Sequence, residues 1–232
     1  PKWLKIDLTS KKSTGETAGI LAKHHMNTIC TSGLCPNRSE CWMARTATLM
    51  IGGDICTRKC RFCNTLSGRP RLLNPDEPRR VAESVKALKL RYAVITSVDR
   101  DDLPDYGAAH WIKTIEEIRR FNPDTKIELL IPDFMGKADL IRQVMATHPH
   151  VAGHNMETVR RLTPSVRSVA RYERSLEVLR EIANCGITAK TGFMLGLDPR
   201  RNLRDNGRYS FNRLSTPHTR SVSPTYCRTP AC

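Results

Sequence analysis

The chain has 232 residues, of which 39% are hydrophobic and 26% are charged, so it is long enough to bury one sizeable core. No apolar run reaches about 18 residues, so we expect no membrane-spanning segment and no membrane partner. The formal charge of +15 is unevenly placed, with a net +5 in residues 198–232. In the rest of the chain the bases mostly alternate with acids along predicted helices, as in residues 116–120, so we expect no nucleic-acid partner.

Short β-rich runs alternate with amphipathic helical patterns from Ala47 onward. The predicted strands cover residues 47–52, 91–98, 126–131, 150–154 and 187–195. The predicted helices cover residues 76–90, 108–121, 137–147 and 172–184. Repeated β-α units with short connections predict a parallel sheet with right-handed crossovers. The fold class is therefore α/β, with five strands that begin a barrel.

Six of the nine cysteines form two triplets within residues 30–63. The first triplet, spaced C-x4-C-x5-C, consists of Cys30, Cys35 and Cys41. The second triplet, spaced C-x3-C-x2-C, consists of Cys56, Cys60 and Cys63. Three thiolates on one short loop suit a cubane iron-sulfur cluster, because they leave one iron without a protein ligand and open to chemistry.

Zinc binding and disulfide formation are the alternatives for these cysteines. Zinc sites prefer paired C-x2-C units that give four ligands, and only Cys60 and Cys63 form such a pair. The odd cysteine count and the lack of an apolar leader segment favour a reducing, cytoplasmic compartment over disulfides. Cys185 ends a helical pattern and is most simply a small apolar core residue.

Polar residues follow the predicted strands where each strand ends. The second cysteine triplet follows the first strand, residues 96–103 follow the second, Pro132 and Asp133 follow the third, and residues 154–157 follow the fourth. In βα barrels the reactive groups lie at the C-terminal ends of the strands. These residues therefore mark one rim as the functional site, although for any one of them solvation or helix capping is an equal alternative.

Several stretches resemble one family, the lipoyl synthases, which are radical S-adenosylmethionine (SAM) enzymes. The resemblance covers residues 1–197, includes both cysteine spacings, and includes Phe62 in the radical SAM pattern C-x3-C-x-F-C. The stretches that carry it are residues 1–5, 28–42, 56–63, 93–104, 127–134 and 154–159. The resemblance implies a partial (β/α)6-type radical SAM barrel with an N-terminal cysteine-rich extension and an irregular C-terminal tail.

The resemblance also implies a reaction and its cofactors, two [4Fe-4S] clusters and SAM. A cluster on Cys56, Cys60 and Cys63 would bind SAM and cleave it to a 5′-deoxyadenosyl radical, which abstracts hydrogen from C6 and C8 of an octanoyl chain. A second, auxiliary cluster on the first triplet would supply the sulfur atoms. The implied partners are an octanoylated lipoyl carrier protein and a reductase or a flavodoxin- or ferredoxin-type electron donor. The cofactors supply the difficult chemistry, so no catalytic residue is assigned beyond the clusters.

Six polar residues are the candidates for holding SAM, on their position and on the resemblance. They are Ser97, Asp99, Asp101, Asn155, Glu157 and Lys190. The alternative for Asp99 and Asp101 is that they only pair with nearby Arg100.

The resemblance ends after Leu197. The family continues with a helix, a strand containing Gly-Gln-Tyr-Leu-Gln-Pro, and an Arg-Ser-Ser-Tyr element whose serine binds the auxiliary cluster. Read one nucleotide on, codons compatible with residues 198–208 and 217–231 can encode the missing helix and strand. We therefore expect residues 198–232 to be an out-of-frame, disordered tail, and the overall reaction to be impaired in a truncated chain.

The predicted organisation has three parts. Residues 1–45 form the auxiliary-cluster segment, residues 46–197 form the partial barrel, and residues 198–232 form the tail. Two other functions remain open: another radical SAM sulfur-inserting enzyme that acts on a small molecule, and a basic metal-binding module without catalysis. Cys227 and Cys232 lie in the tail and are not proposed as metal ligands.

Overall fold

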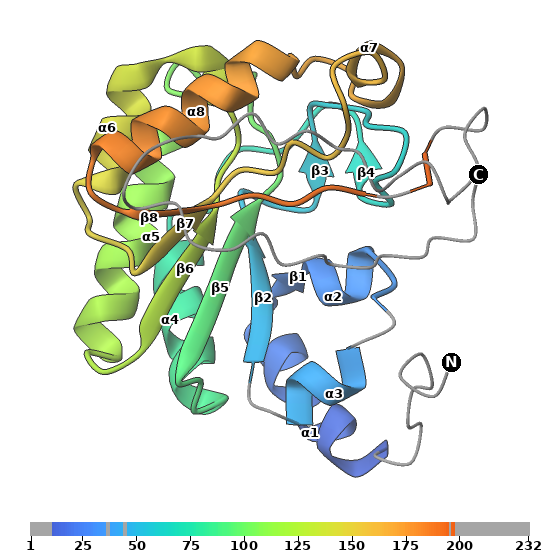
Figure 1. Cartoon of the computed structure of the whole chain (residues 1–232). Helices are drawn as coiled ribbons and strands as arrows, with labels where there is room; N and C mark the ends of the chain where they lie inside the picture. The colour runs from blue at the N-terminus through green and yellow to red at the C-terminus, as the bar shows by residue number, and fades with distance from the viewer. Residues whose placement is uncertain (1–10, 36–37, 44–45, 195, 198–232) are drawn as a thin grey trace.

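A six-stranded sheet forms the centre of the fold in the computed structural model, which describes residues 11–35, 38–43, 46–194 and 196–197 (Figure 1). The strand order is β1-β2-β5-β6-β7-β8, and all pairs except β1 with β2 are parallel. The strands are β1 (Asn27–Thr28), β2 (Thr46–Ile51), β5 (Tyr92–Ser97), β6 (Lys126–Leu130), β7 (Val151–Gly153) and β8 (Thr188–Lys190). The predicted α/β fold with five parallel strands is confirmed.

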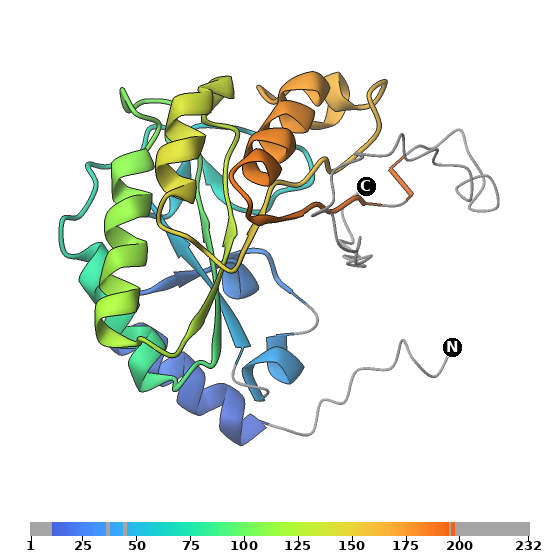
Figure 2. The same cartoon turned by 60° about the vertical axis from the view of Figure 1, so that its left-hand side comes forward.

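Four helices follow the parallel strands and cover one face of the sheet (Figure 2). They are α4 (Glu77–Ala87), α5 (Ala108–Phe121), α6 (Ala138–Met145) and α8 (Tyr172–Asn184). Each helix turns an apolar stripe inward, as with Trp111, Ile115 and Ile118 of α5, which are almost completely buried. The helices therefore bury one face of every parallel strand.

The register of the strands places apolar residues side by side under these helices. Leu49, Ile95, Leu129, Ala152 and Ala189 form one continuous row of partners across the sheet, and all are buried. The next row points to the opposite face, because side chains alternate along a strand. That row carries polar residues such as Thr48 and Glu128, and most of its side chains are only half-buried. The inner face of the sheet is therefore the more polar one.

The N-terminal segment joins the sheet through β1, a strand that the sequence did not predict. Asn27 and Thr28 pair antiparallel with Met50 and Leu49 of β2. The segment also contains α1 (Lys11–Lys23), α2 (Ile29–Ser32) and α3 (Arg38–Met43), and α1 packs against both α3 and α4. The first cysteine triplet is thereby attached to the edge of the sheet.

Four short elements were also not predicted, namely β3 (Ile55–Cys56), β4 (Leu66–Ser67), a 3-10 helix η2 (Phe134–Gly136) and α7 (Thr163–Val166). The predicted strand 187–195 ends at Lys190, after which the chain makes only a single bridge between Phe193 and Glu157. Among the described residues β8 is the last strand of the sheet. The predicted tail, residues 198–232, lies outside the described residues, and no described helix is long and apolar enough to cross a membrane.

Candidate active site

The second cysteine loop begins at two glycines directly after β2. Gly52 and Gly53 have φ angles of 84° and 98°, a backbone conformation that favours glycine. A Cβ atom on Gly52 would also lie 3.3 Å from Cγ2 of Val98. The Gly52 amide donates to Oε2 of Glu77 at 2.8 Å, and its carbonyl accepts from Nη1 of Arg100 at 3.1 Å. The start of the loop is therefore held through both backbone groups of Gly52.

Glu77 is itself a buried, paired carboxylate. Its Oε2 atom lies 2.6 Å from Nε2 of His110, and only 6% of Glu77 is exposed. Burial would raise the pKa of Glu77, but the hydrogen bonds from His110 and from the Gly52 amide outweigh it and lower the pKa. Glu77 is therefore a charged anchor for the turn that leads into the cysteine loop.

The loop is then tied to the end of β5. The Thr57 amide and hydroxyl donate to the Asp99 carbonyl at 3.1 and 3.0 Å, and the Thr57 hydroxyl accepts from the Asp101 amide at 3.1 Å. The sulfur atom of Cys56 accepts from the amides of Arg58 and Asp99 at 3.4 and 3.3 Å. Amide donors aimed at a sulfur atom are the environment that tunes an iron-sulfur ligand.

Arg58 connects the loop to three carboxylates from two strands. It donates to Asp101 at 2.7 and 2.8 Å and to Asp133 at 2.6 Å, and its Nη1 atom lies 3.3 Å from Asp99. Only 5% of Arg58 is exposed, and Asp133 is completely buried. Nη1 of Arg174 adds a second cation, 3.1 Å from Asp133. The residue in the middle of the C-x3-C spacing is therefore a buried tether.

The carboxylates of this group have pKa values that burial and Arg58 shift in opposite directions. For Asp133, burial alone would raise the pKa, but the hydrogen bond and charge of Arg58 lower it to about 2. For Asp99, burial dominates and raises the pKa to about 6, against the opposing charge of Arg58. These buried ion pairs are costly to disrupt, because removing Arg58 leaves buried carboxylates without a compensating charge.

The structure contradicts the alternative that Asp99 and Asp101 pair with Arg100. Arg100 instead donates to Asp102 at 2.9 and 2.8 Å, and Asp99 and Asp101 pair with Arg58. Successive residues after β5 point in alternating directions, so Arg100 and Asp102 share one side while Asp99 and Asp101 share the other.

Two thiols of the second triplet have raised pKa values. Burial raises the pKa of Cys56 to about 11, with Asp99 adding to the effect, and burial also raises the pKa of Cys60. Such thiols are protonated at neutral pH unless a metal charge draws off the proton. Cys63 is exposed, which leaves one side of the loop open to solvent.

The first triplet is held by fewer contacts with the rest of the fold. Burial raises the pKa of Cys41, and the charges of Cys35 and Cys30 raise it further. Nδ2 of Asn64, just after the second triplet, donates to the Ser32 carbonyl at 2.7 Å and links the two cysteine segments. No three His, Cys, Asp or Glu side chains in the described ranges could hold one metal ion. A cubane cluster binds each thiolate through a different iron, so its cysteines need not converge on one point.

The remaining SAM candidates fall into two groups. Ser97 ends β5, while Asn155 and Glu157 follow β7 and contact the chain beyond β8 through Gly192. Burial raises the pKa of Glu157, and the hydrogen bond from Asn155 opposes that shift. These three residues lie at the C-terminal ends of their strands, as predicted.

Lys190 belongs to a different cluster, on the inner face of the sheet. Its Nζ atom donates to Oε1 of Glu128 at 2.6 Å, and the hydroxyl of Tyr92 donates to Oε2 of the same carboxylate at 2.5 Å. Burial and the Glu128 carboxylate raise the pKa of Tyr92. Lys190 is therefore already paired within the sheet.

Sequence reasoning missed Arg58 and Glu77 as parts of the site. It predicted Asp133 and Arg100 at the functional rim, because they follow predicted strands, but it did not predict their partners. For Arg58 and Glu77 no local signal existed, because their partners lie 75 and 25 residues away in the chain.

Comparisons with known proteins agree with this geometry. Residues 50–202 match the Radical SAM superfamily. The lipoyl synthase of Porphyromonas gingivalis is 62% identical over 198 residues, which cover 85% of this chain and 70% of that protein. The lipoyl synthase of Treponema denticola is 52% identical over 201 residues, which cover 87% of this chain and 69% of that protein.

Solved structures share the fold at low identity. The FeFe-hydrogenase maturase HydG from Carboxydothermus hydrogenoformans superposes with a TM-score of 0.56 at 13% identity, over 81% of this chain and 49% of that chain. Methylornithine synthase superposes with a TM-score of 0.51 at 12% identity, over 64% of this chain and 44% of that chain. This chain thus spans less than half the length of these two structures, and the likeness concerns the fold alone. On the sequence relatives and the cysteine site together, the chain belongs to the lipoyl synthase family of the radical SAM superfamily.

Proposed function

We propose that the site serves insertion of sulfur at C6 and C8 of a protein-bound octanoyl chain, and that the overall reaction is impaired in this chain. The observation that carries the proposal is the second cysteine loop, which follows the C-terminal end of β2 and is tied by the buried Arg58 to the segments that follow β5 and β6. When bound, the cluster on this loop supplies the electron that cleaves SAM, and an auxiliary cluster supplies sulfur. The substrate is an octanoylated lipoyl carrier protein, and a protein electron donor completes the reaction.

The chain's own residues bind and orient these groups. Cys56, Cys60 and Cys63 are the proposed ligands of the first cluster, and the Arg58 and Asp99 amides donate to Cys56 and favour its thiolate. Arg58 and its carboxylates fix the loop relative to the barrel. A displacement of about 1 Å between reacting groups can cost on the order of a hundredfold in rate, so this fixation serves the reaction directly.

The six SAM candidates divide into direct and indirect contacts in this proposal. Ser97, Asn155 and Glu157 are proposed to contact SAM at the rim of the barrel. Asp99 and Asp101 act through Arg58, and Lys190 acts from the inner face through Glu128. Cys30, Cys35 and Cys41 are proposed to bind the auxiliary cluster.

Anaerobic reconstitution with iron and sulfide tests the proposal. Substituting Cys56, Cys60 and Cys63 by Ala should abolish SAM cleavage and remove about half of the bound iron or more. Substituting Cys30, Cys35 and Cys41 by Ala should leave SAM cleavage intact and abolish sulfur insertion, measured by mass spectrometry of an octanoylated carrier. One zinc per chain without iron-sulfur absorption would overturn the proposal.

A further inference from the structure

Four large apolar side chains of the described residues are exposed, Leu34, Leu66, Leu72 and Val169, and two of them, Leu66 and Val169, lie in segments bonded to the second cysteine loop. Val169 is 38% exposed and follows Ser168, whose hydroxyl accepts from the Lys59 amide at 3.0 Å. Leu66 is 66% exposed and lies in β4, which pairs with β3 at Cys56.

The two chain segments that frame this loop are strongly basic. Residues 57–75 contain five basic residues and no acid, and residues 158–172 contain four basic residues and no acid. The two segments are joined by the bond from the Arg61 amide to the Val166 carbonyl, at 2.9 Å. Arg58 and Arg167 are buried, and the other seven side chains are exposed. By contrast, α5 on the far side mixes both signs of charge.

We call the exposed side chains of these segments around the cysteine loop the loop surface. It comprises Lys59, Arg61, Leu66, Arg69, Val169 and Arg171. In Figure 1 the β3–β4 pair and α7 lie on the right of the molecule, away from α4 and α5. A basic surface with apolar residues within it fits an acidic protein partner.

We propose that the loop surface docks an acidic, one-electron donor protein of the flavodoxin or ferredoxin type. The proposal rests on the proposed function, because only a redox cluster on this loop gives such a donor a role. The donor gives up one electron and the cluster accepts it, with no transfer of atoms. Cys63 is exposed within this surface, so a docked donor comes close to the cluster from outside the barrel.

The position of the loop surface favours the electron donor over the octanoylated carrier. An octanoyl chain must enter the barrel interior to meet SAM, whereas an electron can cross from the outer side of the loop. A partner seated on the β3–β4 pair and the loop after α7 covers that outer side. The carrier is therefore expected to bind elsewhere.

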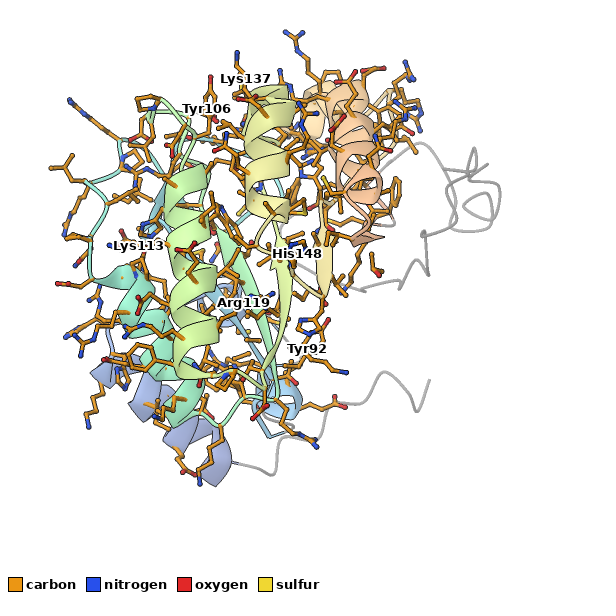
Figure 3. The ribbon with its side chains drawn as sticks, turned by 90° about the vertical axis from the view of Figure 1, so that its left-hand side faces the viewer. Tyr92, Tyr106, Lys113, Arg119, Lys137 and His148 are labelled. Carbon is orange, nitrogen blue, oxygen red and sulfur yellow. The ribbon has the colours of Figure 1, made fainter. Side chains whose placement is uncertain are left out.

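Charge reversal on the loop surface tests the proposal. The test variant is Arg69→Glu with Arg171→Glu, and the matched control is Lys86→Glu with Lys113→Glu on α4 and α5, where Figure 3 labels Lys113. All four residues are exposed. Each variant changes the net charge equally, so general charge effects cancel between them.

Binding of a purified acidic flavodoxin to the reconstituted protein is measured by titration calorimetry at low and high salt. Binding should weaken with salt in the unaltered protein and in the control, and should be at least about tenfold weaker at low salt in the test variant. Stopped-flow absorbance should show slower reduction of the cluster by flavodoxin in the test variant only. A further variant, Leu66→Ser, should weaken binding without changing its salt dependence.

SAM cleavage driven by dithionite separates this proposal from the proposed function. Dithionite needs no docking surface, so the test variant should cleave SAM with dithionite as fast as the unaltered protein. Loss of dithionite-driven cleavage in the unaltered protein would overturn the proposed function, while the calorimetry would still measure docking. Equal flavodoxin affinity in test and control variants, or loss of carrier binding in place of flavodoxin binding, would overturn the docking proposal.

Discussion

The two cysteine triplets contain the same number of thiols but have very different support. Residues 56–63 are held by partners from the segments that follow β5 and β6, from α7 and from the loop after α7, and Arg58 is buried among them. Residues 30–35 rely mainly on local bonds, such as that from the Cys35 amide to the Cys30 carbonyl at 3.2 Å. The difference teaches that a metal-binding motif can be local in sequence and still depend on the tertiary structure for its rigidity.

Removing Arg58 should have the largest effect, because it removes the buried partner that holds the second triplet and leaves the first triplet unchanged. Arg58→Ala leaves Asp101 and Asp133 without their main cation, so the free energy of unfolding should fall by about 3–5 kcal/mol. The second triplet should also lose most of its iron. Denaturant unfolding of the apo protein and iron analysis after reconstitution measure the two effects. Arg61→Ala, in the same loop but exposed, is the control. Full iron binding and near-normal stability in Arg58→Ala would mean that the tether is dispensable.

Acid should destabilise the folded protein through His154, which directly follows β7. Burial lowers the pKa of His154 to about 4, and its ring nitrogens contact the Ile131 carbonyl and the Ser175 hydroxyl at 2.9 and 3.0 Å. The unfolded chain protonates at about 6.5, above the folded value, so stability is full above that pH and is lost as the pH falls toward 4. The loss should reach about 3 kcal/mol.

Denaturant unfolding of the apo protein between pH 7.5 and pH 4.5 measures this dependence. His154→Asn removes the titrating group, so its stability should be lower at pH 7 but should vary less over the same range. If both proteins lose stability in parallel, another group accounts for the acid sensitivity.

Two glycine substitutions, one at the start of the second cysteine loop and one in α1, should change the free energy of unfolding in opposite directions. Gly52→Ala forces a side chain into a left-handed conformation against Val98 and should cost about 1–2 kcal/mol. Gly19→Ala lies within α1, where a Cβ atom meets nothing within 4 Å, and should stabilise the helix by up to about 1 kcal/mol. Thermal unfolding compares the two variants with the unaltered protein. Destabilisation by Gly19→Ala would contradict the placement of α1.

The smallest effect on stability is expected at the hydrogen bond that joins the two cysteine segments. Asn64→Ala removes the exposed hydrogen bond to the Ser32 carbonyl and should change the free energy of unfolding by less than about 1 kcal/mol. It should nevertheless speed the release of iron from the proposed auxiliary cluster to a chelator. The reason is that this bond links the first cysteine segment to the better-held second cysteine loop. Asn74→Ala, an exposed asparagine with a local contact to the Asp76 amide, is the matched control. Equal release rates would show that the link carries no support.

Much of the fold could be predicted because its signals are local. The strand predicted at 91–98 lies at Tyr92–Ser97, and the helix predicted at 108–121 has the same bounds in the structure. Hydrophobic periodicity determines such elements, since it decides which face can be buried. β1 could not be predicted, because two residues carry no periodicity and their pairing depends on β2.

For the site, the sequence by itself determined that each triplet lies within a short stretch of chain, and this spacing predicts which thiols share a cluster. It did not determine what holds them. Arg58 meets Asp101 and Asp133 across 43 and 75 residues, and Lys190 meets Glu128 across 62. Parallel strands bring such residues together only after crossover helices have packed, so only the tertiary structure decided which charges pair and which side chains remain exposed to a partner.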